Sequence, residues 1–364
     1  MPRKNPKRIT VKVGTKVLTT KTNEIDIESV SRIVEQTSLL LAKGIEVIIV
    51  SSGAIGGGLG ILGISRKNKS LSELQAIASI GQPYLMNIYS TLFQKKGYKT
   101  GQILLTQEDF NDRKRFLNIR YTLNTLFQYK AVPIINENDS VSNEEIKFGD
   151  NDRLSSLVAD ISVSDMLIIL TDVEGVYDDN GKVIPRVEID EDIKKYCKGK
   201  GSEESTGGMA TKAKSVLSAA RAGIDAVIAP GRRENVILDI VYGREIGTFF
   251  PACDNKITAR KRWIAYSIKP KGRIIIDDGA VLAVRDKKKS LLPSGVLKVE
   301  GMFSEGSVVE IVSKNNQVVA RGLINYSSEI IDQIKGCQSL AIEKLLGFKD
   351  YDELVHRDNL VVVE

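Results

Sequence analysis

The chain alternates short apolar runs that favour β-strands with longer segments that favour amphipathic helices, and this alternation is its strongest constraint on fold. Six such strands are expected, at residues 9–13, 46–50, 101–106, 131–136, 166–172 and 225–230. Residues 25–44 and 71–96 have helical patterns, and the first ends at Gly44. Strands that alternate with helices predict a mostly parallel sheet with helices on both faces, which is a three-layer α/β sandwich. Ligands of such sheets bind at the carboxyl ends of the strands.

The pattern changes at Gly272, where short strands and glycine turns begin. Strands are expected in the segments 272–277, 295–301, 307–313, 317–326 and 359–364. This pattern predicts a second, small β-rich barrel domain. We expect a catalytic domain at residues 1–262, a linker at 263–271 and the small domain at 272–364.

Composition indicates a soluble cytoplasmic protein. A chain of 364 residues, 42% hydrophobic, can bury the cores of two domains. No apolar run approaches the roughly 18 residues that a membrane span requires, and the basic start does not lead into a signal-peptide core. The three cysteines are widely separated and odd in number, which suits a reducing compartment.

The net charge of +6 is unevenly distributed. Residues 1–270 contain 39 lysines and arginines against 32 acidic residues, whereas residues 271–364 contain 13 against 14. The basic excess favours an anionic ligand such as a nucleotide in the larger domain. The slightly acidic smaller domain disfavours RNA as a partner, because RNA affinity depends heavily on phosphate neutralisation. The chain has a single histidine, His356, so any mechanism that needs a histidine base must use that one.

A literal G-x-G-x-x-G occurs at Gly58, Gly60 and Gly63, but a dinucleotide site is not expected there. The first glycine of that fingerprint should make the turn that leaves the strand, and an acidic residue should follow about 20 positions later. Here the apolar run ends at Val50, and no carboxylate lies at the required distance. The segment Ser51 to Ala54 is of greater interest, because its hydroxyls and amides come at an expected helix start.

Polar residues follow several of the expected strands. Lys12 and Gly14 end the first strand, Asn138 and Asp139 follow the fourth, and Thr171 and Asp172 end the fifth. A second polar cluster at residues 149–152 opens a helix. These side chains exceed what helix capping needs, and they should meet at one edge of the sheet.

A Walker A motif is absent, so phosphate chemistry would need another arrangement. The segment "STGGMATKAKS", residues 205–215, supplies one, because a glycine pair leads into an expected helix that carries Lys212 in its first turn.

Taken in order, "VKVGT", "VSSGAIGGG", "INENDSV", "FGDND", "LTDVEGVY" and "TGGMATK" resemble the amino-acid kinase family, and most closely its members that phosphorylate glutamate. The resemblance covers the whole chain, and the region after Gly272 resembles a PUA domain. It implies transfer of the γ-phosphoryl group of ATP, with Mg²⁺, to the side-chain carboxylate of L-glutamate. The product, glutamyl 5-phosphate, starts proline biosynthesis.

The resemblance also implies roles for individual residues. Lys12 and Lys212 would approach the transferring phosphoryl group from opposite sides, and Asp152 would hold both lysines. Ser52, Asp139 and Asn151 would contact glutamate, with Asp139 facing the α-ammonium group. The nucleotide contacts would be Lys12, Thr171, Asp172, Thr206, Gly207, Gly208, Met209, Ala210, Thr211 and Lys212. No residue is assigned as a metal ligand.

The family resemblance further implies feedback inhibition by proline, a homodimer or homotetramer, and hand-off of the product to glutamyl-phosphate reductase. One residue departs from the family pattern, because Ser205 stands where a glycine is expected. Three alternatives stay open at this stage: a kinase of the same fold for N-acetylglutamate, aspartate, carbamate, UMP or an isoprenoid phosphate, an RNA-binding protein, and a catalytically inactive member of the family.

Overall fold

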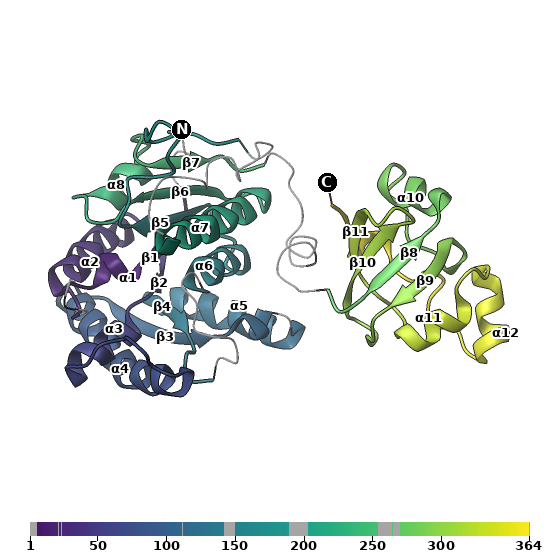
Figure 1. The fold of residues 1–364 in the computed structure, drawn as a ribbon, viewed down its shortest axis with the longest axis horizontal. Coiled ribbons are helices and arrows are strands. Elements are labelled where there is room, and N and C mark those ends of the chain that lie inside the picture. Colours follow the sequence, from purple (N-terminus) through teal and green to yellow (C-terminus); the bar gives the residue numbers. More distant parts are fainter. Residues whose placement is uncertain are drawn as a thin grey trace. The chain divides into compact units, whose positions relative to one another are not determined.

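The computed structural model of the chain contains two compact units, residues 1–256 and 257–364 (Figure 1). It describes residues 6–20, 22, 24–110, 112–141, 150–188, 203–253, 264 and 270–363. Most of the expected linker at 263–271 lies outside these ranges, as does Cys197. The domain boundaries drawn from the sequence therefore stay a prediction.

The first unit is built on a seven-stranded sheet, and all six strands expected from the sequence are present. Its order is β3-β4-β2-β1-β5-β6-β7. The strands are β1 (Arg8–Val13), β2 (Glu46–Ser51), β3 (Lys99–Leu105), β4 (Ala131–Glu137), β5 (Met166–Thr171), β6 (Asp225–Pro230) and β7 (Thr248–Phe250). The first six are parallel, and β7 pairs antiparallel with β6. The sequence analysis did not predict β7, which has three residues.

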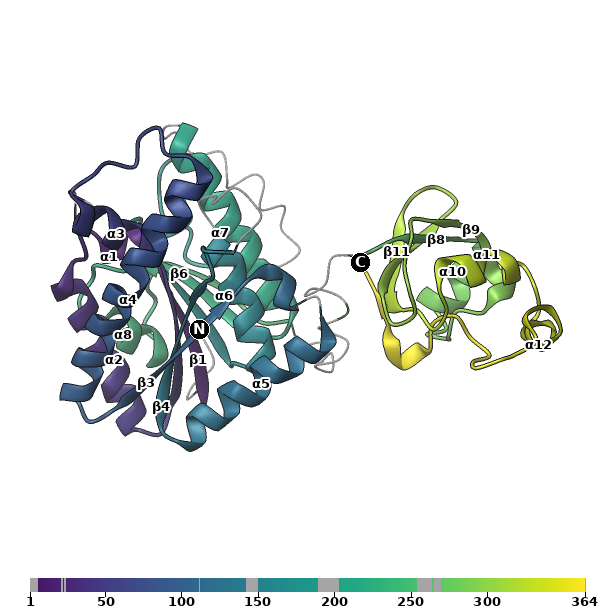
Figure 2. The same cartoon turned by 90° about the horizontal axis from the view of Figure 1, so that it is seen from below.

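Helices cover both faces of this sheet, as expected for a three-layer sandwich (Figure 2). One layer contains α2 (Ile27–Ala42), α4 (Leu71–Lys95) and α8 (Val236–Val241), which share a hydrophobic core with the sheet. The other contains α5 (Arg113–Gln128), α6 (Asp150–Ile161) and α7 (Glu203–Arg221). Shorter elements are α1 (Thr15–Leu18), α3 (Ala54–Leu62) and the 3₁₀ turn η1 (Gln107–Phe110).

Strand alternation decides which side chains face each layer. In β1, Val11 and Val13 belong to the core beneath α2 and α4. Lys12, between them, must point to the opposite layer, because successive side chains of a strand point to opposite faces. It thereby faces α6 and α7 near the carboxyl end of the strand.

The second unit has a five-stranded sheet in the order β12-β11-β10-β8-β9. Its strands are β8 (Arg273–Ile276), β9 (Val296–Glu300), β10 (Val308–Ser313), β11 (Val318–Leu323) and β12 (Leu360–Val362). All five were expected. The strand pattern did not reveal α10 (Asp278–Arg285), α11 (Ser328–Ile334) and α12 (Ile342–Leu346), which are too short for a clear helical period. The only histidine, His356, lies in this unit, where its Nδ1 accepts a hydrogen bond from the backbone of Asp358.

No helix in the described part of the chain is both long and apolar enough to cross a membrane.

The glycine-rich stretch after β2 serves helix packing. Gly53, with φ of 100°, caps α3, and the next glycines lie inside that helix. A Cβ atom on Gly58 would lie 2.0 Å from the carbonyl oxygen of Ile77, and one on Gly81 would lie 1.9 Å from that of Ala54. Two helices can approach this closely only where neither has a side chain. The first glycine of the literal G-x-G-x-x-G, Gly58, is thus part of the α3–α4 contact, and the last, Gly63, ends α3, in agreement with the rejection of a dinucleotide site.

We expect Gly58→Ala to destabilise the first unit by about 1–3 kcal/mol, because the added methyl group meets backbone that cannot yield. Gly57→Ala is the matched control, since a Cβ there lies 3.4 Å from its nearest neighbour, and alanine is the better helix former. Urea unfolding of both variants measures the difference. Equal stability of the two would contradict the packing role.

Candidate active site

The sequence-predicted site residues gather at the carboxyl ends of the parallel strands. Lys12 lies near the end of β1, Ser52 follows β2, Asp139 follows β4, Thr171 ends β5, and Asp172 follows it. Helix α6, which carries Asn151 and Asp152, packs on β1 and β2 from one side. This is the edge at which open α/β sheets bind ligands.

Asp152 holds two lysines from distant parts of the chain. Its Oδ1 lies 2.6 Å from Lys12 Nζ, and its Oδ2 lies 3.1 Å from Lys212 Nζ. The Asp152 side chain is fully buried, and the side chains of the two lysines are 6% and 16% exposed. Thr211 Oγ1 also lies 3.4 Å from Oδ2. We call Lys12, Asp152 and Lys212 the lysine cluster.

The lysine cluster has one more positive than negative charge, and its burial makes this costly. Burial is the main cause that lowers the pKa of Lys12 below its ordinary value of 10.5. The carboxylate of Asp152 opposes this shift, whereas the neighbouring ammonium of Lys212 adds to it. A further anion at the cluster would relieve the excess charge.

The segment 206–212 differs from the sequence-based expectation. The glycine pair does not precede the helix but lies inside α7, which begins at Glu203, so Lys212 is not in the first turn. A glycine inside a helix costs only about 1 kcal/mol relative to alanine, so two glycines do not stop a helix that good helix formers continue. The Gly208 carbonyl accepts hydrogen bonds from Thr211 Oγ1 at 2.9 Å and Lys212 Nζ at 3.3 Å.

For the other residues of α7 that were expected to contact the nucleotide, the structure describes the side-chain surroundings only from Gly208 onward. Met209 and Ala210, like Thr211 and Lys212, are partly exposed. Thr206 and Gly207 belong to the helix, but the surroundings of their side chains, like those of Ser205, lie outside the described residues.

Ser52 and Asn151 form a second contact beside the lysine cluster. Asn151 Nδ2 donates to Ser52 Oγ at 3.3 Å, which joins the end of β2 to the start of α6. Among the residues that the structure describes, the buried Oδ1 of Asn151 has no hydrogen-bond partner. An unsatisfied buried acceptor is costly, so it marks a place where a donor from a ligand would be stabilised.

Asp139 lies in different surroundings. With Glu137, Asn138 and Gln82 it lines a cavity of about 280 Å³ between α4, β3 and the end of β4. The guanidinium group of Arg66, from the α3–α4 turn, interacts electrostatically with Asp139; burial nevertheless lowers the pKa of Arg66. Sequence reasoning missed Arg66, because nothing in the pattern relates that turn to the loop after β4.

Thr171 and Asp172 meet a further cation that was also missed. Thr171 Oγ1 lies 3.1 Å from Asp172 Oδ1, and Lys16 Nζ lies 3.0 Å from Asp172 Oδ2. Burial raises the pKa of Asp172, but the hydrogen bonds from Lys16 and Thr171 outweigh it, and the net pKa lies below its ordinary value. The carboxyl group is therefore ionised at neutral pH.

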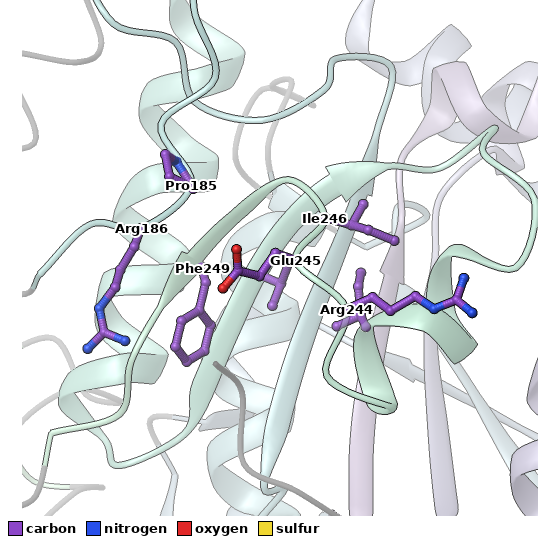
Figure 3. Close-up of a pocket in the computed structure, with 8 residues that line it drawn as sticks. Pro185, Arg186, Arg244, Glu245, Ile246 and Phe249 are labelled. Carbon is purple, nitrogen blue, oxygen red and sulfur yellow. The ribbon is translucent and has the colours of Figure 1, made fainter.

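A second cavity, of about 130 Å³, lies beside β7 (Figure 3). Arg186, Arg244, Glu245 and Phe249 line it, and the Arg186 guanidinium lies 5.6 Å from the centre of the Phe249 ring. None of the sequence-predicted site residues lines this cavity.

Comparison with known proteins shows the family of the chain. The model of the amino acid kinase family matches residues 7–230, which include all the predicted site residues. The chain belongs to the amino acid kinase family. A PUA domain model matches residues 272–346 of this kinase.

Full-length relatives of this amino acid kinase are known from several bacteria. A glutamate 5-kinase of Caldanaerobacter subterraneus subsp. tengcongensis is 47% identical over 364 residues, 98% of each chain. Those of Thermoanaerobacter sp. (strain X514) and Pelobacter propionicus are 45% and 44% identical, again over 98% of each chain. The expectation of a two-domain kinase is thereby confirmed.

We expect Asp152→Asn to destabilise this kinase by about 3–5 kcal/mol, because it leaves the buried ammonium group of Lys12 and the partly buried one of Lys212 without a counter-charge. The pKa of Lys12, already lowered by burial, would fall further in the folded state, so that state would bind fewer protons than the unfolded chain between the lowered pKa and 10.5. The free energy of unfolding of the variant should therefore rise with pH across this window, more steeply than that of the wild type.

Urea unfolding at pH 7, 8.5 and 10 measures both effects. Adding Lys12→Met to Asp152→Asn should restore part of the stability, because one buried charge is then removed. A loss below about 1 kcal/mol that does not depend on pH would show that Asp152 does not balance the lysines.

Proposed function

We propose that this kinase phosphorylates the side-chain carboxylate of L-glutamate with ATP, giving L-glutamyl 5-phosphate, the first step of proline biosynthesis. The observation that carries the proposal is the lysine cluster, with Lys12 and Lys212 held by one buried carboxylate at the ligand-binding edge of the sheet. The substrate rests on the relatives, which are glutamate 5-kinases over nearly the whole chain.

The chemistry requires charge neutralisation and no proton transfer. The glutamate side chain is ionised at pH 7, so one of its oxygens can attack the γ-phosphorus of ATP without a base. The bond from the γ-phosphorus to the β,γ-bridging oxygen breaks, and ADP leaves with that electron pair. The main barrier is the repulsion between anions, which fixed cations lower. A kinase unit without a histidine is suited to this reaction.

We assign the lysine cluster to the transferring phosphoryl group. Lys12, from β1, and Lys212, from α7, would contact its oxygens, and Asp152 would position both ammonium groups. Thr171, Asp172 and the segment from Thr206 to Lys212 would bind the nucleotide.

We propose that Mg²⁺ enters with ATP. In phosphoryl transfer this ion is held by one or two carboxylates together with substrate phosphates. The described residues contain no cluster of three or more His, Cys, Asp or Glu side chains that could hold a metal. Both oxygens of Asp152 already pair with lysines, so Asp172 would be the carboxylate that binds the ion. The ion would neutralise phosphate charge.

The acceptor would bind on the other side of the lysine cluster. Ser52 and Asn151 would contact glutamate, and the unsatisfied Oδ1 of Asn151 offers an acceptor to one of its donors. Asp139 would pair with the α-ammonium group. Asp139 already interacts with Arg66, so the α-ammonium group of glutamate would either share Asp139 with that guanidinium group or displace it.

We further propose that the enzyme works in the cytoplasm, where ATP is available, as a homodimer or homotetramer. Proline would inhibit it by competing near the glutamate site. The acyl phosphate product is reactive, so a glutamyl-phosphate reductase would consume it.

Acceptor specificity tests the proposal directly. Purified enzyme with MgATP and hydroxylamine would be offered L-glutamate, N-acetyl-L-glutamate, L-aspartate or UMP, with ADP and hydroxamate both measured. We expect ADP and hydroxamate with L-glutamate only. N-acetyl-L-glutamate lacks the ammonium group that Asp139 would bind, and L-aspartate is one methylene shorter.

Hydroxamate with another acid alone would retain the kinase chemistry and overturn the assignment of Asp139. If ADP but no hydroxamate forms in the presence of UMP, the acceptor is a phosphate group and not a carboxylate. Turnover of none of the four would contradict the proposed function.

A further inference from the structure

Lys16 places a third ammonium group beside the lysine cluster. It is the second residue of the short helix α1, which begins directly after Gly14 at the end of β1. Its Nζ lies 3.0 Å from Asp172 Oδ2, and Asp172 in turn acts electrostatically on Lys12. Lys16, Asp172 and the lysine cluster therefore form one group of charges at the carboxyl ends of β1 and β5.

The backbone of Lys16 is fixed although its side chain is exposed. Arg232, after β6, donates through Nη2 to the carbonyl oxygens of Lys16, at 3.0 Å, and Thr19, at 2.9 Å. The same guanidinium pairs with Asp26 at 3.1 Å. On the other side, the Gly14 amide donates to Leu170 O at 3.0 Å. These bonds hold the start of the Lys16 side chain at the site edge, whereas the rest of the side chain is exposed.

The ion pair of Lys16 with Asp172 is easily exchanged. The Lys16 side chain is 73% exposed and that of Asp172 is 39% exposed. Exposed pairs contribute little to stability, so the ammonium can leave Asp172 for a stronger anion at small cost. Lys12 differs, because its ammonium is buried against Asp152 and cannot move without leaving that charge unpaired.

The charge balance of the site favours such an exchange. The three lysines and two aspartates have one net positive charge, whereas the polyphosphate of ATP has several negative ones. A mobile ammonium on a fixed backbone supplies a positive charge where the phosphates would lie. Lysine is suited to this as a compact charge on a flexible stem.

We propose that Lys16 is a nucleotide-binding residue that releases Asp172 when ATP arrives and pairs with its β- or γ-phosphate. The proposal depends on the kinase activity, but it does not depend on which acceptor the enzyme uses.

A series of nucleotides tests this without turnover. Dissociation constants of adenosine, AMP, ADP and ATP would be measured by calorimetry for wild type and Lys16→Gln, with Mg²⁺ and no acceptor. Adenosine and AMP should bind both proteins equally. The variant should lose roughly tenfold in affinity from the first nucleotide that carries the contacted phosphate, as for a charge-assisted hydrogen bond at a partly exposed site. A loss that begins at ADP identifies the β-phosphate, and one that begins at ATP identifies the γ-phosphate.

Two further variants separate this role from a structural one. Lys16→Arg keeps the charge and should recover most of the affinity for ATP. Lys96→Gln is the matched control, because Lys96 is also an exposed lysine in an ion pair, with Glu35 at 3.1 Å, but it follows α4 near the amino end of β3. It should bind every nucleotide as the wild type does.

Two results would overturn the proposal. Equal affinity of wild type and Lys16→Gln for all four ligands would mean that the ammonium stays with Asp172. An equal loss for adenosine and ATP would mean that Lys16 shapes the site without touching phosphate.

Discussion

The structure of this site depends on one buried carboxylate that must be neutralised. Asp152 is fully buried, and a buried carboxylate is tolerated only when cations and hydrogen bonds satisfy it. Two lysines do so, one from the first strand of the sheet and one from α7, 200 residues later in the numbering. Asp152 therefore fixes the relative positions of two elements and leaves one uncompensated positive charge. Burial is the main cause of the depressed pKa of Lys12, and the neighbouring ammonium of Lys212 adds to it. An arriving phosphoryl group would relieve the excess charge.

The fold supplies the rest of the arrangement through strand direction and alternation. Because β1, β2, β4 and β5 are parallel, the residues after them meet at one edge. Because Val11 and Val13 face the core beneath α2 and α4, Lys12 is directed to the opposite layer, where α6 carries Asp152. The glycines of α3 and α4 allow those helices to pack closely beside this edge.

Much of this architecture could be predicted from the sequence. Every strand of at least five residues was predicted. The order of the motifs at the strand ends indicated the family, which the comparison confirmed. The helices α10 to α12 were missed, because such short helices show no clear period, and β7 was also missed although the equally short β12 was found. The helical glycine pair of α7 was misplaced, since the two glycines were interpreted as a loop that leads into the helix, although the cost of glycine inside a helix is modest.

The contacts between side chains of the site were harder to predict from the sequence. The roles of Lys12, Asp152 and Lys212 came from the family resemblance, and the structure brings these three together. Lys16 and Arg66 were not identified, although Lys16 directly follows the motif "VKVGT". Which carboxylate a lysine meets depends on how separate strands align, and spacing along the chain does not contain that information. The roles assigned to the site residues stay a proposal.

The most direct test of the account is to measure MgATP affinity and the single-turnover rate of phosphoryl transfer on the same Lys212→Gln enzyme. If the lysine cluster acts on the transferring group, the rate should fall roughly 100-fold or more, as for loss of one electrostatic contact in a transition state, while the dissociation constant of MgATP changes only a few-fold. If affinity falls as far as the rate, Lys212 binds the nucleotide equally in the ground state and the transition state. That result would contradict the central claim.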